Sequence, residues 1–265
     1  MLEFSVLASG SSGNAVYIKT DQTSLLLDVG ISGRQVQQRL QAAANAKLED
    51  IDAILVTHEH IDHVRGLKQA VKVSDAKIYT TQGTWHHVYR QVEEHCSPDR
   101  VTWVVADQPF TVGDIKVTPF SVSHDAEEPV AYRFDAGDDS LAVVTDLGYV
   151  SDHIKQVIQD CAAYVWEANH DVDMLRAGRY PWSVKRRILG DKGHLSNYDC
   201  AVALADILGD RLVEVYLAHL SEENNQPDLA ELTVQSVLRE IKSSYGEQVR
   251  LHRTARHTAT TLRAL

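Results

Sequence analysis

Residues 54–66, ILVTHEHIDHVRG, decide the fold class of this chain. An apolar run ends in a stretch of six residues that holds three histidines and an aspartate: His58, His60, Asp62 and His63. Successive side chains alternate in an extended strand, so His58 and His60 point to the same side. As the chain turns into a helix, Asp62 and His63 can face a second point nearby. The stretch therefore predicts a loop that supplies ligands to two adjacent metal ions.

A zincin site does not explain this stretch. The HExxH motif needs two histidines four residues apart on one helical turn, and the residue four after His58 is Asp62. The spacing favours a loop between a strand and a helix.

Other apolar runs also end in residues of the kind that bind metals. FSVSH ends in His124, LAVVTD in Asp146 and VYLAH in His219, while SLLLD ends in Asp28. Strands that deliver polar tips to one edge of a sheet can hold a site rigidly. We therefore expect these four residues to meet the HEHIDH loop.

The rest of the chain alternates short β-branched runs with helical patterns and turns. So many strands with so few helices favour stacked sheets covered by helices, an α/β (α+β) protein, over a doubly wound parallel sheet. With no low-complexity linker or short-period repeat, we expect one domain over residues 1–265. Strands are predicted at 4–8, 15–19, 24–28, 52–57, 77–81, 101–105, 115–123, 130–134, 141–145, 163–167, 214–219 and 249–254, and helices at 33–45, 63–73, 83–95, 151–160, 196–209 and 227–244.

Composition excludes several classes of protein. A chain of 265 residues with 44% hydrophobic content can bury a substantial core. No apolar run reaches the roughly 18 residues of a membrane span, and the first residues lack a secretion signal, so we expect a cytoplasmic protein. The three cysteines, Cys96, Cys161 and Cys200, are far apart, which argues against a disulfide framework and a thiolate zinc site.

The charge distribution points to a phosphate-rich partner. The net charge is -11, but residues 174–192 hold six basic residues and one acid, and residues 250–265 hold four basic residues and no acid. An acidic body with two basic patches would draw a polyanion to particular places. Solvated basic faces without a partner are the alternative interpretation.

The order of these motifs resembles the five-motif pattern of the metallo-β-lactamase superfamily over nearly the whole chain. The resemblance implies a four-layer αββα sandwich and two divalent metal ions, zinc or manganese. It also implies the ligand sets: His58, His60 and His124 on one ion, Asp62, His63 and His219 on the other, Asp146 bridging both, and Asp28 orienting a ligand through a hydrogen bond.

Two further motifs narrow the chemistry. Glu167 in VWEANHD and His194 in GHLSN resemble the paired glutamate and histidine motifs of the nuclease branch related to tRNase Z. The resemblance implies that His194 is the general acid and that Glu167 orients it; we add Asp62 to the catalytic candidates. A phosphodiester needs such an acid because its leaving group is an alkoxide, whereas a thiolate does not.

Within the superfamily, the chain looks most like the YycJ/WalJ group of bacterial nucleases, through LASGSSGNAVYI, SVSHDA, WEANHD, GHLSN and LAHLS. That implies an exonuclease acting on double-stranded DNA from the five-prime end. An RNA-processing or small cyclic phosphodiesterase and a non-catalytic metal-bearing scaffold stay open. Expected phosphate contacts are Ser12 and Asn14, whose turn could equally have a purely conformational role, and Arg179, Lys185, Arg186 and Arg187; Tyr180 and Trp182 could stack on bases or pack under a loop.

Overall fold

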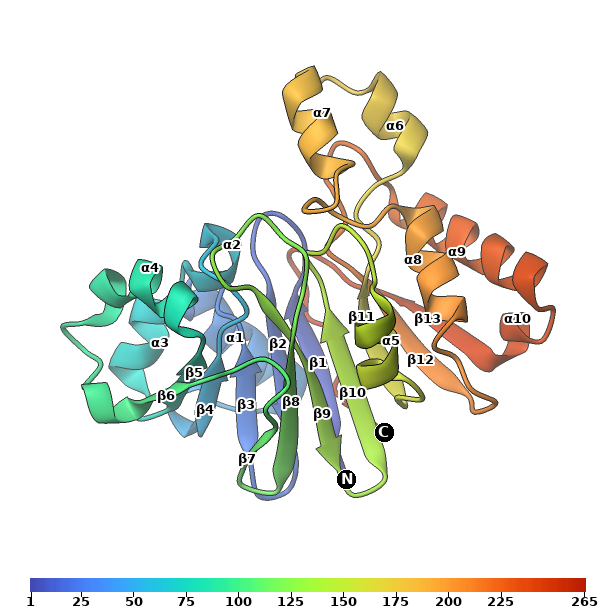
Figure 1. Ribbon diagram of the computed structural model, residues 1–265. Coiled ribbons are helices and arrows are strands. Elements are labelled where there is room, and N and C mark those ends of the chain that lie inside the picture. The colour runs from blue at the N-terminus through green and yellow to red at the C-terminus, as the bar shows by residue number, and fades with distance from the viewer. The chain divides into compact units, whose positions relative to one another are not determined.

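The computed structural model describes all 265 residues and divides them into two compact units (Figure 1). Unit 1 comprises Met1–Ser121, Ala126–Asp139 and Thr254–Leu265, and unit 2 comprises Val122–Asp125 and Ser140–Arg253. Neither unit is one continuous stretch, so the division does not fall at a linker that composition could reveal. The single domain over 1–265 stays a prediction.

The first seven-stranded sheet lies in unit 1, in the order β14-β1-β2-β3-β4-β5-β6. Strands β1, β2 and β3 form an antiparallel meander, and β3 to β6 run parallel. The parallel run brings the carboxyl ends of β3 and β4, followed by Asp28 and His58, to one edge. The strands are β1 (Glu3–Ala8), β2 (Ala15–Lys19), β3 (Ser24–Leu27), β4 (Ala53–Leu55), β5 (Lys77–Thr80), β6 (Val101–Trp103) and β14 (Arg263–Ala264).

Helices beside this sheet bury its apolar face. Leu26, Ile54, Val36, Leu67 and Val88 are fully buried in one cluster. Removing that apolar area from water is the main stabilising contribution to unit 1. The helices, visible beside the blue strands in Figure 1, are α1 (Gly33–Ala44), α2 (Ile61–Val64), α3 (Leu67–Val73) and α4 (Gln82–Val92), with short 3₁₀ turns η1 (Leu48–Asp50) and η2 (Pro98–Arg100).

The predicted helix at 63–73 is wrong in one respect, because it is two helices. Gly66 stands between α2 and α3, and its N–H donates to Val29 O at 2.7 Å. A Cβ at Gly66 would lie 2.1 Å from Ile31 O. The helix is interrupted at Gly66 because the backbone there packs directly against the segment that follows β3.

The second seven-stranded sheet has the order β13-β12-β11-β10-β9-β8-β7. In unit 1, β7 to β9 pair antiparallel; in unit 2, β10 to β13 pair parallel. The parallel strands of unit 2 carry Asp146, Glu167 and His219 at or beyond their carboxyl ends. The strands are β7 (Phe110–Val112), β8 (Ile115–Ser121), β9 (Val130–Ala136), β10 (Asp139–Val144), β11 (Ala163–Glu167), β12 (Val213–Ala218) and β13 (Val249–Arg253).

Two helices of unit 2 begin at local capping signals in the sequence. The hydroxyl of Ser196 accepts a hydrogen bond from Asp199 N at the start of α8, and Pro227 opens α9. The helices are α5 (Asp152–Ile158), α6 (Val172–Ala177), α7 (Trp182–Ile188), α8 (Asn197–Ala205), α9 (Pro227–Ile241) and α10 (Tyr245–Gln248).

Two mixed seven-stranded sheets with helices confirm the predicted fold class. The strands β7 and β14 and the helices α6, α7 and α10 were not predicted, because each is too short to show a clear periodic pattern. None of the helices has the length and apolar character needed to cross a membrane.

Candidate metal centre

In unit 1, Asp28 and Thr57 orient two of the predicted metal ligands. Thr57 Oγ1 donates to Asp28 Oδ2 at 2.9 Å, and His63 Nδ1 donates to the same oxygen at 2.7 Å. His58 Nδ1 lies 2.9 Å from Thr57 Oγ1 and donates to it. Both rings thus use Nδ1 for an oxygen acceptor, which leaves Nε2 as the nitrogen that could bind a metal. Thr57 is a residue that the sequence analysis missed.

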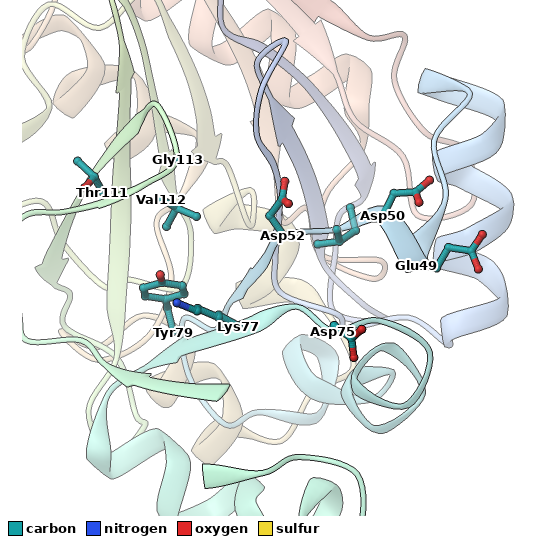
Figure 2. Close-up of a pocket in the computed structure, with 10 residues that line it drawn as sticks. Glu49, Asp50, Asp52, Asp75, Lys77, Tyr79, Thr111, Val112 and Gly113 are labelled. Carbon is teal, nitrogen blue, oxygen red and sulfur yellow. The ribbon is translucent and has the colours of Figure 1, made fainter. Parts of the chain in front are cut away.

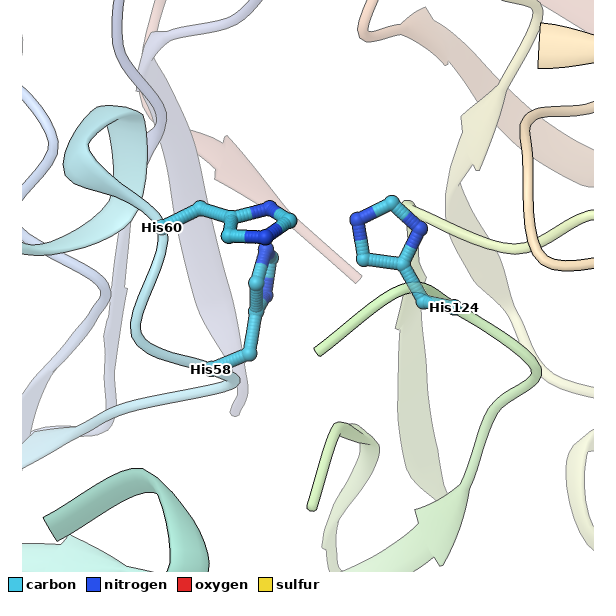
Figure 3. A group of neighbouring side chains, drawn as sticks. All are labelled: His58, His60 and His124. Carbon is cyan, nitrogen blue, oxygen red and sulfur yellow. The ribbon is translucent and has the colours of Figure 1, made fainter. Parts of the chain in front are cut away.

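The other two residues of the loop lie beside this pair. The ring of His60 is 4.6 Å from that of His58 between centroids, and the ring of His63 is 4.1 Å from it. Figure 3 shows His58 and His60 on the loop that follows β4. Asp62 Oδ2 is 3.8 Å from His63 Nε2, at the first turn of α2. The structure therefore brings together the four loop residues and Asp28.

The glycine-rich turn before β2 supports this loop from behind. Asn14 N donates to Asp62 O at 2.8 Å, and Gly30 N donates to Asn14 O at 2.7 Å. A Cβ at Gly30 would lie 1.6 Å from Asp62 O, and Gly13 has a φ of 153°. Glycine is needed here because three backbone segments touch.

The side chain of Asn14 faces the ligands. Its Oδ1 accepts from Gly10 N at 2.9 Å, and its Nδ2 lies 3.2 Å from His63 Nε2 and 3.5 Å from Asp62 Oδ2. Asn14 is buried, so these contacts favour the conformational role over a phosphate contact. A phosphate contact by Ser12, whose carbonyl accepts from Arg65 at 2.9 Å, stays a prediction.

In unit 2, Glu167 joins the predicted acid to a predicted ligand. Its Oε1 accepts hydrogen bonds from His194 Nδ1 at 2.9 Å and from His219 Nδ1 at 2.8 Å. Its Oε2 accepts from Leu147 N at 3.1 Å and Leu195 N at 3.3 Å. Burial alone would raise the pKa of Glu167, but the charges and hydrogen bonds of the two histidines lower the pKa to about 2. The carboxylate is therefore ionised.

These residues form a group that could hold a metal ion. Asp146, Glu167, His194 and His219 each offer a ligand atom, and these atoms lie within 4.8 Å of one another. Asp146 Oδ1 is 3.4 Å from His219 Nδ1. Since Glu167 occupies Nδ1 of His219, Nε2 is again the nitrogen left to bind a metal.

His124 lies on the loop that follows β8 (Figure 3). Like His219, it turns Nδ1 toward an acceptor oxygen. Its Nδ1 lies 3.4 Å from Gly193 O, and its Nε2 lies 3.8 Å from Asp146 Oδ1. The pKa of His124 is lowered, and burial of the ring is the largest cause. The neutral ring is the form that binds metals.

Three of the strand-end residues have a strained backbone. Asp28, Asp146 and His219 have φ angles of 59°, 62° and 56°. The left-handed region costs a non-glycine residue roughly 1–2 kcal/mol. Asn169 Nδ2 holds the strained His219 by donating to its carbonyl at 2.8 Å. Such strain gathered at three strand ends is typical of a functional site.

The predicted acid lies on a tightly packed loop after α7. His194 N donates to Ile188 O at 3.0 Å, and a Cβ at Gly193 would lie 2.1 Å from the same oxygen. The side chain of His194 is 15% exposed, whereas that of Glu167 is fully buried. With Nδ1 bonded to Glu167, Nε2 is the atom that can reach a substrate.

The basic segment, residues 174–192, is only partly available to a ligand. The prediction that Lys185 contacts phosphate is wrong. Lys185 is buried, and its Nζ donates to Arg176 O at 2.6 Å and Gly178 O at 2.7 Å. Its charge is used to close the turn between α6 and α7. Arg187 is exposed and pairs with Asp125 at 2.8 Å. Arg179 and Arg186 are exposed.

A separate pocket of about 530 Å³ lies in unit 1 (Figure 2). Carboxylates of Glu49, Asp50, Asp52 and Asp75 line it beside Lys77. Asp52 directly precedes β4, whereas the histidine loop follows that strand, so the pocket is at the opposite end of the strand from the ligands. Its acidic lining is unsuited to a phosphate chain.

Comparison with known sequences gives consistent matches. The family model described as Beta-lactamase superfamily domain matches residues 23–220. The chain is 46% identical over 253 residues to Exodeoxyribonuclease YycJ of Bacillus anthracis, covering 96% of this chain and 95% of that protein. It is 41% identical over 262 residues to Exodeoxyribonuclease WalJ of Streptococcus pneumoniae, covering 98% and 97%.

Solved structures share the fold at low sequence identity. The metallo-beta-lactamase fold protein YhfI of Bacillus subtilis matches with a TM-score of 0.71 and 15% identity, covering 98% of this chain and 99% of that one. The short form of human tRNase Z matches with a TM-score of 0.66 and 16% identity, covering 99% and 100%. These matches confirm the predicted fold.

Proposed function

The chain belongs to the metallo-β-lactamase superfamily, and from this premise we propose that it is a two-metal exonuclease acting on double-stranded DNA from the five-prime end. It is a metal-dependent hydrolase, with His/Asp clusters consistent with a dinuclear site. Two relatives that match almost the whole chain are named exodeoxyribonucleases, which supports DNA as the substrate. The observation that carries the proposal is Glu167, bonded to both His194 and His219.

The proposed ligands fit a pair of divalent ions. His58, His63, His124 and His219 each turn Nδ1 toward an oxygen, the arrangement that prepares Nε2 for a metal. Nitrogen and oxygen donors without sulfur suit zinc or manganese. We assign His58, His60 and His124 to one ion, Asp62, His63 and His219 to the second, and Asp146 to both.

Two bound divalent ions supply a water nucleophile at neutral pH and neutralise phosphate charge. The chain's own residues do the rest. Glu167 accepts a hydrogen bond from Nδ1 of His194. When the His194 ring is protonated it carries its second proton on Nε2, gives that proton to the leaving oxygen and ends as the neutral ring still bonded to Glu167. Hydrogen bonds to Asp28 and Thr57 fix the ring orientations of His58 and His63.

The test uses purified protein supplied with zinc or manganese. Its substrates are duplex DNA labelled at the five-prime end, single-stranded DNA, RNA and bis(p-nitrophenyl) phosphate. We expect fastest degradation of the duplex, with label released from the five-prime end. Faster cleavage of RNA would favour an RNA-processing enzyme instead. Full metal content without hydrolysis of any substrate would contradict an enzyme altogether.

A further inference from the structure

Two short helices carry a basic and aromatic surface on unit 2. We call α6, α7 and the turn between them, residues 172–188, the α6–α7 arm. Figure 1 shows the arm standing clear of strands β10 to β13 and joined to unit 2 by loops. Within its two helices Leu175, Lys185 and Ile188 are buried and the other residues are partly or fully exposed.

Internal contacts make the arm a preformed element. The Lys185 ammonium bridges Arg176 O and Gly178 O, which closes the turn. Asp171 caps α6 by accepting from Met174 N at 2.8 Å. A Cβ at Gly178 would lie 2.6 Å from Asn224 Oδ1, so the turn also packs on the segment before α9. A preformed surface loses little conformational entropy when it binds a partner.

The outer surface of the arm has the chemistry of a nucleic-acid contact. Trp182, the first residue of α7, is 59% exposed. Arg179 and Arg186 are exposed, and neither pairs with a carboxylate. The surrounding residues 174–192 hold six basic residues and one acid in a chain of net charge -11. Aromatic rings stack on bases, and guanidinium groups bind phosphates.

The arm leads directly to the proposed acid. Ile188, the last residue of α7, accepts the hydrogen bond from His194 N. Ile188 follows Trp182 by six residues, so at 1.5 Å per residue roughly 9 Å of helix axis separates the two backbone positions. That length is about three base-pair steps of duplex DNA. A nucleic acid whose end rests on the arm would have its cleaved linkage near the base of α7.

We propose that the α6–α7 arm binds the end of the DNA duplex, with Trp182 stacked on the terminal base and Arg179 and Arg186 on the adjacent phosphates. This inference rests on the proposed function and names the element that recognises its substrate. The occupant is a duplex end, because a protein that tracks a single strand needs a series of aromatic platforms. The arm has one strongly exposed ring.

The experiment compares two variants, Trp182→Ala and the double reversal Arg179→Glu/Arg186→Glu. The probe is a blunt duplex with 2-aminopurine at its terminal position and phosphorothioate linkages that resist hydrolysis. The controls are Trp103→Ala, which removes a 47% exposed indole of unit 1, and Lys72→Glu/Arg90→Glu, which reverses two exposed charges there. Hydrolysis of ordinary duplex DNA, of single-stranded DNA and of bis(p-nitrophenyl) phosphate is measured in parallel.

We expect wild-type protein to quench 2-aminopurine and Trp182→Ala to lose the quenching. Both arm variants should lower kcat/KM on duplex DNA by about tenfold or more, in the range of a lost base stack. Both controls, and hydrolysis of the small ester by every variant, should match wild type.

Unchanged quenching and kcat/KM in Trp182→Ala would overturn the role of the arm, and so would equal losses on duplex and single-stranded DNA. The proposed function fails separately, when wild type hydrolyses the small ester but degrades no DNA. Quenching still tests the arm in that case, because it does not depend on cleavage.

Discussion

His194 Nδ1 lies 2.9 Å from Oε1 of Glu167, a carboxylate with no exposed surface. The same oxygen accepts from His219, so one buried group fixes both a proposed proton donor and a proposed metal ligand. A change at Glu167 would therefore affect both proton donation and metal binding, whereas a change at one histidine would affect only one of them. Variants that remove one histidine at a time should distinguish them.

We predict that His60→Ala abolishes hydrolysis together with metal binding, because His60 is a proposed ligand. His194→Ala should keep its metal, and its kcat should fall by about 10²- to 10⁴-fold, the contribution of a positioned acid. Metal content by elemental analysis and kcat on duplex DNA check both. Equal metal loss in the two variants would contradict the division of roles.

A second prediction concerns Thr57. Thr57→Val keeps the shape of the side chain but removes the hydroxyl that bonds Asp28 and His58. Freed from its acceptor, the His58 ring can rotate, so metal affinity should fall by about 10- to 100-fold. A metal titration measures this, and Thr84→Val, also at a buried hydroxyl of unit 1, is the matched control. Unchanged affinity in Thr57→Val would show that the Thr57 hydroxyl is not needed to orient His58.

The third prediction tests the close backbone contact behind the ligand loop. Gly30→Ala places a Cβ against Asp62 O, so it should displace Asp62 and lower both stability and metal affinity. Gly137→Ala is the control: Gly137 has a φ of 62° but open space around it, so only backbone strain of about 1 kcal/mol is expected. Urea unfolding and metal titration should separate the two. Equal effects would contradict the importance of the contact between position 30 and Asp62 O.

The position of the proposed ligands at strand ends was predictable because their chemistry and their place along the chain agree. Asp28, His58, Asp146 and His219 each follow an apolar run. Parallel pairing brings the ends of β3 and β4 to one edge of the first sheet, and the ends of β10 to β12 to one edge of the second. The start of α8 was predictable for a similar reason, since Ser196 and Asp199 form a local capping pair.

Features that depend on tertiary contacts were not predictable. Lys185 belongs to a basic run, yet it is buried because two carbonyls of a turn surround its ammonium. The α6–α7 arm was missed because Gly178 and Pro181 interrupt a short helical pattern. The dual role of Glu167 needs a histidine 27 residues away and another 52 residues away, and no local pattern shows that.

The last prediction concerns His170, a buried histidine for which neither ring nitrogen has a hydrogen-bond partner in the structure. Burial, the largest influence, lowers the pKa of His170 to about 4. In the unfolded chain a histidine has a pKa of about 6.5, so between these values the unfolded state binds the extra proton. Stability contributed by the neutral ring is thus complete above about pH 6.5 and is lost as the pH falls towards 4.

We therefore expect the free energy of unfolding of the metal-free protein to fall between pH 7 and pH 4.5, and to fall less steeply in His170→Leu. His153→Leu, at an exposed histidine of the same unit, should keep the wild-type slope. Urea unfolding at several pH values measures all three proteins. Parallel slopes for wild type and His170→Leu would show that other groups, rather than the uncharged ring of His170, set the acid sensitivity.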